Sequence, residues 1–133
     1  MTENMNPRVV IEQNCSWCEA FSETSFVSIL HEDGLWQREQ YWLLEWAVCN
    51  LISNAVEHAD VCAPIFQIFS RTIGLICSHL DSNDLFEIKN LERDDVYAFR
   101  DRIQIVFEGF FLKRLPKNAL FDELNPLLPK DGS

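Results

Sequence analysis

The strongest constraint on the fold is the spacing of apolar residues between positions 92 and 115. Apolar side chains recur there at intervals of three and four, while Asp94, Asp101 and Glu108 recur every seven residues on nearly the opposite face. This pattern is typical of an amphipathic helix, which we expect to begin near Glu92 or Asp94 and to end before Pro116. Its apolar positions are Val96, Phe99, Ile103, Val106, Phe107 and Phe110.

Three earlier segments also have helical patterns. The first is expected from position 14 or 16 to 31, because Ser16 and Glu19 fit a capping box, and Gly34 is expected to end it. The second is expected over 35–58, and the third over 64–80, as a central helix with Pro64 in its first turn. We also expect a short helix over 118–124, an N-terminal arm over 1–14, a C-terminal tail over 125–133, and a strand or one helical turn over 85–90.

Composition supports the same fold class. With only four Gly and five Pro in 133 residues, the chain has too few turn-forming residues for a turn-rich all-β fold. Its length is that of one domain. We therefore predict an all-α fold, a single-domain bundle of four to five helices spanning residues 1–133.

The expected helix over 35–58 carries apolar residues on two sides. One stripe contains Leu44, Val48, Leu51 and Ala55, and the opposite stripe contains Trp42, Trp46, Cys49 and Ser53. Either the helix is central and buries both stripes, or Trp42 and Trp46 are exposed anchors of an interaction surface. In both cases we expect Glu39, Glu45 and Glu57 to reach solvent or a basic partner.

Charge is distributed unevenly along the chain. Residues 1–63 contain ten acids and two bases, whereas residues 64–133 contain eleven acids and nine bases, so that -8 of the net charge of -10 lies in the first half. Such a field favours a basic protein partner and disfavours direct contact with nucleic acid, whose phosphates it would repel. Simple solubility is the alternative explanation.

Sites for chemistry are weakly indicated. Cys15 and Cys18 have the spacing of a zinc knuckle that His58 and Cys62 could complete, but no Gly-containing turn follows them. The simpler interpretation is that the cysteines pack between helices. No catalytic triad spacing or phosphate-binding loop is present, and carboxylate pairs lie at expected helix starts or turns: Glu32-Asp33, Asp94-Asp95 and Asp122-Glu123. We therefore predict neither an enzyme nor a bound cofactor or metal.

The sequence also bears on location. It lacks a basic segment followed by an apolar one at the N-terminus, and no apolar run approaches the roughly 18–20 residues of a membrane span. Five scattered cysteines suit a reducing compartment. We therefore expect a cytoplasmic protein without a membrane partner.

An acidic helical domain with the segment Trp42-x-x-Glu45-Trp46 and the pair Glu19 and Glu23 resembles the small immunity proteins of bacteria. These are paired with toxin domains in contact-dependent growth inhibition and related polymorphic-toxin systems. The resemblance implies that the chain binds one cognate toxin, often a basic nuclease, and blocks its active site.

Under this hypothesis, acids of the first two helices replace the phosphates that a nuclease cleft binds, and Trp42 or Trp46 slows dissociation. The expected partner-binding residues are Glu19, Glu23, Glu39, Trp42, Glu45, Trp46 and Glu57. Three alternatives stay open: a nucleic-acid mimic or regulatory adaptor, a small helical metal-binding protein or enzyme, and a homo-oligomer formed through the Trp stripe or the Phe-rich helix.

Overall fold

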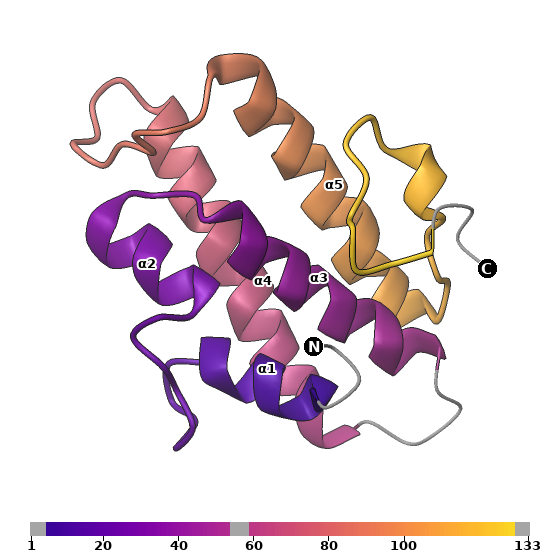
Figure 1. The fold of residues 1–133 in the computed structure, drawn as a ribbon. Coiled ribbons are helices and arrows are strands. Elements are labelled where there is room, and N and C mark those ends of the chain that lie inside the picture. Colours follow the sequence, from indigo (N-terminus) through magenta and orange to yellow (C-terminus); the bar gives the residue numbers. More distant parts are fainter. Residues whose placement is uncertain (1–4, 54–58, 130–133) are drawn as a thin grey trace.

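The computed structural model describes residues 5–53 and 59–129, and the chain is helical throughout the regular parts of these ranges. Five α-helices follow one another: α1 (Pro7–Asn14), α2 (Phe26–Asp33), α3 (Arg38–Ser53), α4 (Ala59–Leu80) and α5 (Arg93–Leu112). A 3-10 turn, η2 (Asn118–Leu120), precedes the C-terminal segment (Figure 1). The all-α prediction is confirmed, and the described residues form one compact domain without strands.

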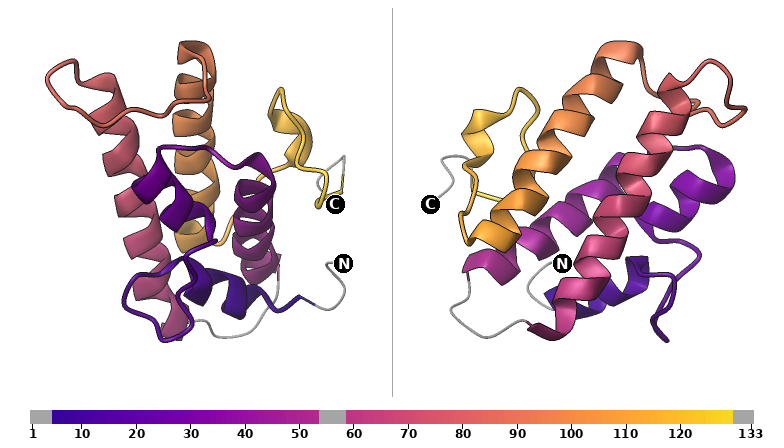
Figure 2. Two further views of the ribbon diagram at one scale, coloured as in Figure 1. Left: turned by 60° about the vertical axis from the view of Figure 1, so that its left-hand side comes forward. Right: turned by 180° about the vertical axis from the view of Figure 1, so that it is seen from behind.

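The two longest helices, α4 and α5, lie side by side, and α3 packs against α5 (Figures 1 and 2). The short α1 contacts α3 and α4, and α2 contacts the same two helices. The segment after η2 lies beside α3 and α5, at the opposite side of the molecule from α2 (Figure 1). The fold therefore leaves one long side of α4 uncovered by other helices (Figure 2, right).

The core is centred on α3. Both apolar stripes are buried along most of their described length, with Ser53 exposed at the end of the helix, which supports the interpretation of α3 as a central helix. An aromatic cluster joins α3 to α2 and α5, with ring centroids 4.6 Å apart for Trp36 and Phe99 and 5.3 Å apart for Phe26 and Tyr41. Edge-to-face and tilted packing of this kind adds to the stabilisation from buried area. Ala55 and Glu57 lie outside the described residues.

The N-terminal region differs most from the prediction. Instead of an arm over 1–14 and a helix from 14 or 16 to 31, it contains α1, an irregular segment over 15–25, and α2. Asn6 caps α1 by accepting a hydrogen bond from the Arg8 amide at 2.9 Å, and Pro7 occupies the first turn. Ser25, rather than Ser16, caps α2. The Asn-Pro start signal of α1 is the one that the sequence interpretation missed.

The boundaries of the other helices are shifted in smaller ways. Helix α4 begins at Ala59, five residues before the predicted start at 64. Pro64 therefore lies inside the helix, where its missing N–H costs one intrahelical bond. Helix α5 ends at Leu112 because Lys113 adopts a left-handed conformation (φ 60°), and the predicted helix over 118–124 is reduced to η2. Gly34 (φ 66°) ends α2 as predicted.

Helix α4 is not the central helix that we predicted, because much of one face is exposed. Ala63, Phe66, Ser70 and Gly74 all lie on this face. By length and composition α4 could also cross a membrane, contrary to the expectation that no run approaches this length. Core helices of soluble proteins have the same length and composition.

Candidate interaction surface

Three of the predicted partner-binding residues do not reach the surface. Trp42, Glu45 and Trp46 are 7%, 1% and 8% exposed. The expectation that Glu45 reaches solvent is therefore wrong, and the two tryptophans belong to the core rather than to an exposed stripe. The sequence did not identify Arg102, which neutralises Glu45 from α5.

The Glu45 carboxylate is fully engaged within the protein. It accepts hydrogen bonds from Arg102 Nε at 2.7 Å and from Arg102 Nη2 at 2.9 Å. The Tyr41 hydroxyl donates to the same carboxylate at 2.9 Å, and Asn125 Nδ2 donates to it at 3.1 Å. This group links α3 to α5 and to the C-terminal segment.

The Arg102 guanidinium is packed between aromatic rings and hydrogen-bonded. Its carbon atom lies 4.7 Å from the centroid of Trp42 and 4.2 Å from that of Phe121, and Nη1 donates to the carbonyl of Glu123. Burial alone would lower the pKa of Arg102, but the hydrogen bonds and the charge of Glu45 outweigh it and raise the pKa above its usual value. The ion pair thus has a structural role, and we assign it no part in binding.

Neighbouring groups respond to the same buried charge. Burial, followed by the charge of Glu45, raises the pKa of Cys49 to about 12 and raises the pKa of Tyr41 well above its usual value. Both groups are therefore neutral at physiological pH. A neutral thiol and a neutral phenol are poor nucleophiles, so this cluster has no activated group.

The other predicted acids lie at the surface. Glu19 and Glu23, in the irregular segment over 15–25, are exposed, as is Glu39 in the first turn of α3. Glu57 lies outside the described residues. Glu32 and Asp33, at the end of α2, are exposed as well and extend the acidic surface toward Glu23.

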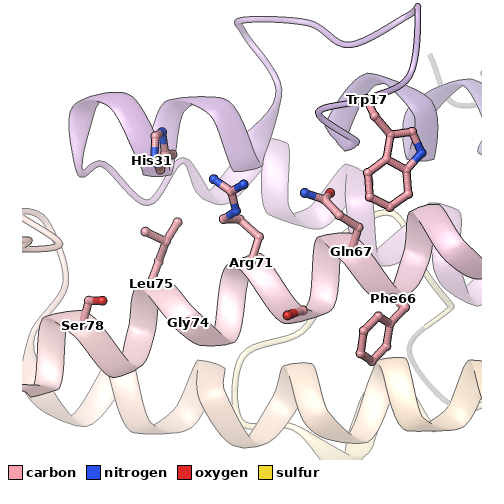
Figure 3. A pocket seen from close by; sticks show the side chains of 9 residues that line it. Trp17, His31, Phe66, Gln67, Arg71, Gly74, Leu75 and Ser78 are labelled. Atoms are coloured by element: carbon pink, nitrogen blue, oxygen red, sulfur yellow. The ribbon is translucent and has the colours of Figure 1, made fainter.

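A groove runs between α4 on one side and α2 with the 15–25 segment on the other, and we call it the α2–α4 groove. It consists of two adjoining hollows of about 680 and 540 Å³, which share His31, Gln67 and Arg71. Figure 3 shows His31 and Trp17 on one side, with Gln67 and Arg71 pointing toward them from α4. Glu23, Glu32 and Asp33 line the second hollow.

Trp17 is the exposed tryptophan of the groove. It is 61% exposed, whereas Trp36, Trp42 and Trp46 are buried. The predicted helix from 14 or 16 to 31 would have included Trp17, but this residue lies in the irregular segment after α1, which ends at Asn14. Recognition of the Asn6-Pro7 start would have moved the first helix to before residue 14, but the exposure of Trp17 depends on how distant segments pack.

The cysteine pair shows no activation. Cys15 is buried, and burial followed by a hydrogen bond with Cys15 raises the pKa of Cys18 to about 11. The raised pKa keeps the Cys18 thiol protonated at neutral pH, so it is a weak nucleophile. Within residues 5–53 and 59–129, no group of three His, Cys, Asp or Glu side chains could hold a metal ion, and His58 lies outside these ranges.

Comparisons with protein-family models, with curated proteins and with solved structures find no match to this chain.

Proposed function

We propose that the chain is a non-catalytic binding protein that neutralises a cognate basic protein toxin, of the nuclease class, by docking an acidic surface on it in the cytoplasm. The observation that supports this best is the set of exposed carboxylates along α2 and the segment before it: Glu19, Glu23, Glu32 and Asp33. Arg71 is the only Lys or Arg among the described residues that line the adjacent groove.

Such a surface acts mainly on the rate of association. Individual exposed charges contribute little affinity, but a cluster of one sign attracts a basic partner over a distance of about 8 Å at physiological salt. Association then becomes faster at low salt. Because Trp42 and Trp46 are buried, as is Glu45, they cannot act as the expected apolar anchor. We assign this role to the exposed Trp17 instead.

Growth rescue tests the function. Where the gene next to the one for this chain encodes a toxin domain, that domain is expressed in a bacterial host with and without the chain, and we expect the chain to restore growth and to form a one-to-one complex. A neighbouring frame that encodes no toxin, or a toxin that kills equally in both cultures, would overturn the proposal. Binding to a host DNA-binding protein instead would favour a nucleic-acid mimic.

A matched pair of charge reversals tests the surface. Glu23→Lys changes the acidic surface, while Asp122→Lys makes the same change in net charge at an exposed acid in the C-terminal segment, away from α2 (Figure 1). We expect Glu23→Lys to slow association several-fold and to weaken its salt dependence, with Asp122→Lys having a much smaller effect. Equal effects of the two changes would mean that net charge, and not this surface, attracts the partner.

A further inference from the structure

The α2–α4 groove combines apolar walls with an acidic end. Trp17, Phe66 and Leu75 contribute apolar surface to the first hollow, and Phe66 is 59% exposed. The second hollow, which is continuous with the first through His31, Gln67 and Arg71, contains Glu23, Glu32 and Asp33. Glu32 also contacts His31 Nδ1 at 2.9 Å, and Arg71 lines the same hollow. Exposed aromatic side chains beside three carboxylates, which outnumber the one guanidinium, match a ligand that is itself apolar and basic.

Helix α4 leaves open space in this groove at Gly74. A Cβ atom built on Gly74 would meet nothing within 4 Å outside its own helix. Because the position carries no side chain and has no neighbour above it, an incoming side chain can approach the backbone of α4 closely. Figure 3 shows Gly74 on α4 between Arg71 and Ser78.

One polar group in the groove lacks a partner. Gln67 Nε2 donates to Ser16 Oγ at 3.1 Å, but Gln67 Oε1 is covered and has no hydrogen-bond partner among the described residues. An unsatisfied amide oxygen is costly, and a small rotation of the half-buried Gln67 side chain would offer it to an N–H donor from a bound segment. Lys and Arg are such donors.

We propose that the α2–α4 groove receives a basic segment of the partner protein, with one apolar side chain over Gly74, another against Trp17, and flanking Lys or Arg residues at Glu23, Glu32 and Asp33. This rests on the proposed function and deepens it, because it names the binding face and the chemistry of the bound segment. The positive charge of Arg71 repels a basic ligand, so it limits the affinity and favours binding of the ligand's Lys or Arg side chains away from Arg71, at the carboxylates.

Trp17 provides a direct readout of groove occupancy. It is the exposed tryptophan of the four, so acrylamide should quench its fluorescence first. The probe is an amidated 18-residue amphipathic peptide of Leu and Lys, compared with a peptide in which Ala replaces Leu. We expect the Leu peptide to protect Trp17 from quenching, and to do so less at high salt, while the Ala peptide protects it much less.

Substitutions at Gly74 and Arg71 complete this test. Gly74→Tyr fills the groove and should weaken binding of the Leu peptide at least tenfold, whereas Gly74→Ala, which adds only a methyl group in open space, should change it less than twofold. Arg71→Glu should tighten binding about three- to tenfold, a gain that loss of folding cannot imitate. Unprotected Trp17, or equal binding by Gly74→Tyr and Gly74→Ala, would overturn the inference.

The toxin separates this inference from the function on which it rests. With the toxin domain that the growth assay uses, Trp17→Ala should weaken binding about 30-fold or more, as removal of a central aromatic anchor does. Phe111→Ala, at a 46% exposed aromatic of α5 outside the groove, should bind like the wild type. Full rescue by Trp17→Ala and Gly74→Tyr would refute the groove and leave the function intact, whereas failure of the wild type would refute the function.

Discussion

Removal of Arg102 should destabilise the protein more than any surface substitution, because it leaves the carboxylate of Glu45 buried without its counter-charge. Arg102→Met keeps the aliphatic stem between Trp42 and Phe121 but removes the two hydrogen bonds to Glu45, at 2.7 and 2.9 Å, and the one to the Glu123 carbonyl. Glu45 is 1% exposed, so water cannot replace these donors without local opening.

The expected loss follows from this geometry. Breaking a buried ion pair by removal of one partner costs about 3–5 kcal/mol, which is a large part of the roughly 5–15 kcal/mol that stabilises a domain. The Tyr41 hydroxyl and Asn125 Nδ2 continue to donate to Glu45, so we expect a value near 3 kcal/mol, the lower end of about 3–5. The double variant Glu45→Leu with Arg102→Met should recover part of this loss, because no unpaired charge remains.

Urea unfolding at pH 7, followed by circular dichroism, measures these values in the two single variants and the double variant. Each curve gives a midpoint and a slope, and an unchanged slope shows that the midpoints can be compared. A loss below about 1 kcal/mol for Arg102→Met would show that the pair is not shielded from water and would refute the reasoning. A double variant that is less stable than both single variants would refute the assigned cause.

Three further changes test other parts of the fold. Gly34→Ala should destabilise the protein by about 1–3 kcal/mol, because Gly34 has a φ of 66° and a Cβ there would collide with the carbonyl oxygen of Glu87. Gly74→Ala, in open space, should instead stabilise α4 by about 0.5–1 kcal/mol. The midpoints of urea unfolding measure both changes. The free energy of unfolding should fall above pH 9, because the pKa of Cys49 is about 12 in the folded protein and 9.0 for an unperturbed thiol, so only the unfolded chain releases this proton. The expected loss from Cys49 is about 1.4 kcal/mol at pH 10. Between pH 8 and pH 10, Cys49→Ala should therefore lose less stability than the wild type. Ser25→Ala should cost about 1 kcal/mol in the same assay, because it removes the cap of α2; no loss would mean that another group caps this helix.

The fold class could be predicted from local sequence patterns. The apolar spacing of α5 and the helix stop at Gly34 depend on residues within one or two turns, so they are visible in the sequence and are present in the structure. Boundaries were less accurate where two signals competed. Ser16 and Glu19 resemble a cap, but the true starts, at Asn6-Pro7 and at Ser25, divide that region into two helices.

The candidate surface could be predicted only in part. The excess of acids in the first half of the chain is a property of the sequence, and Glu19, Glu23 and Glu39 are exposed as expected. The exposed tryptophan could not be identified in the same way. Periodicity describes the sides of one helix, but it does not say which sides other helices cover.

Tertiary structure decided which individual side chains are buried and which are exposed. Glu45 reads as a surface acid within its own helix, yet Arg102, 57 residues away, meets it in the core. Trp42 is buried against Phe99 and Arg102 of α5, whereas Trp17 is exposed because its segment is not helical and lies beside the open face of α4. The sequence by itself determined helices and net charge, since both are local or additive; which residues face a partner was decided by packing between distant segments.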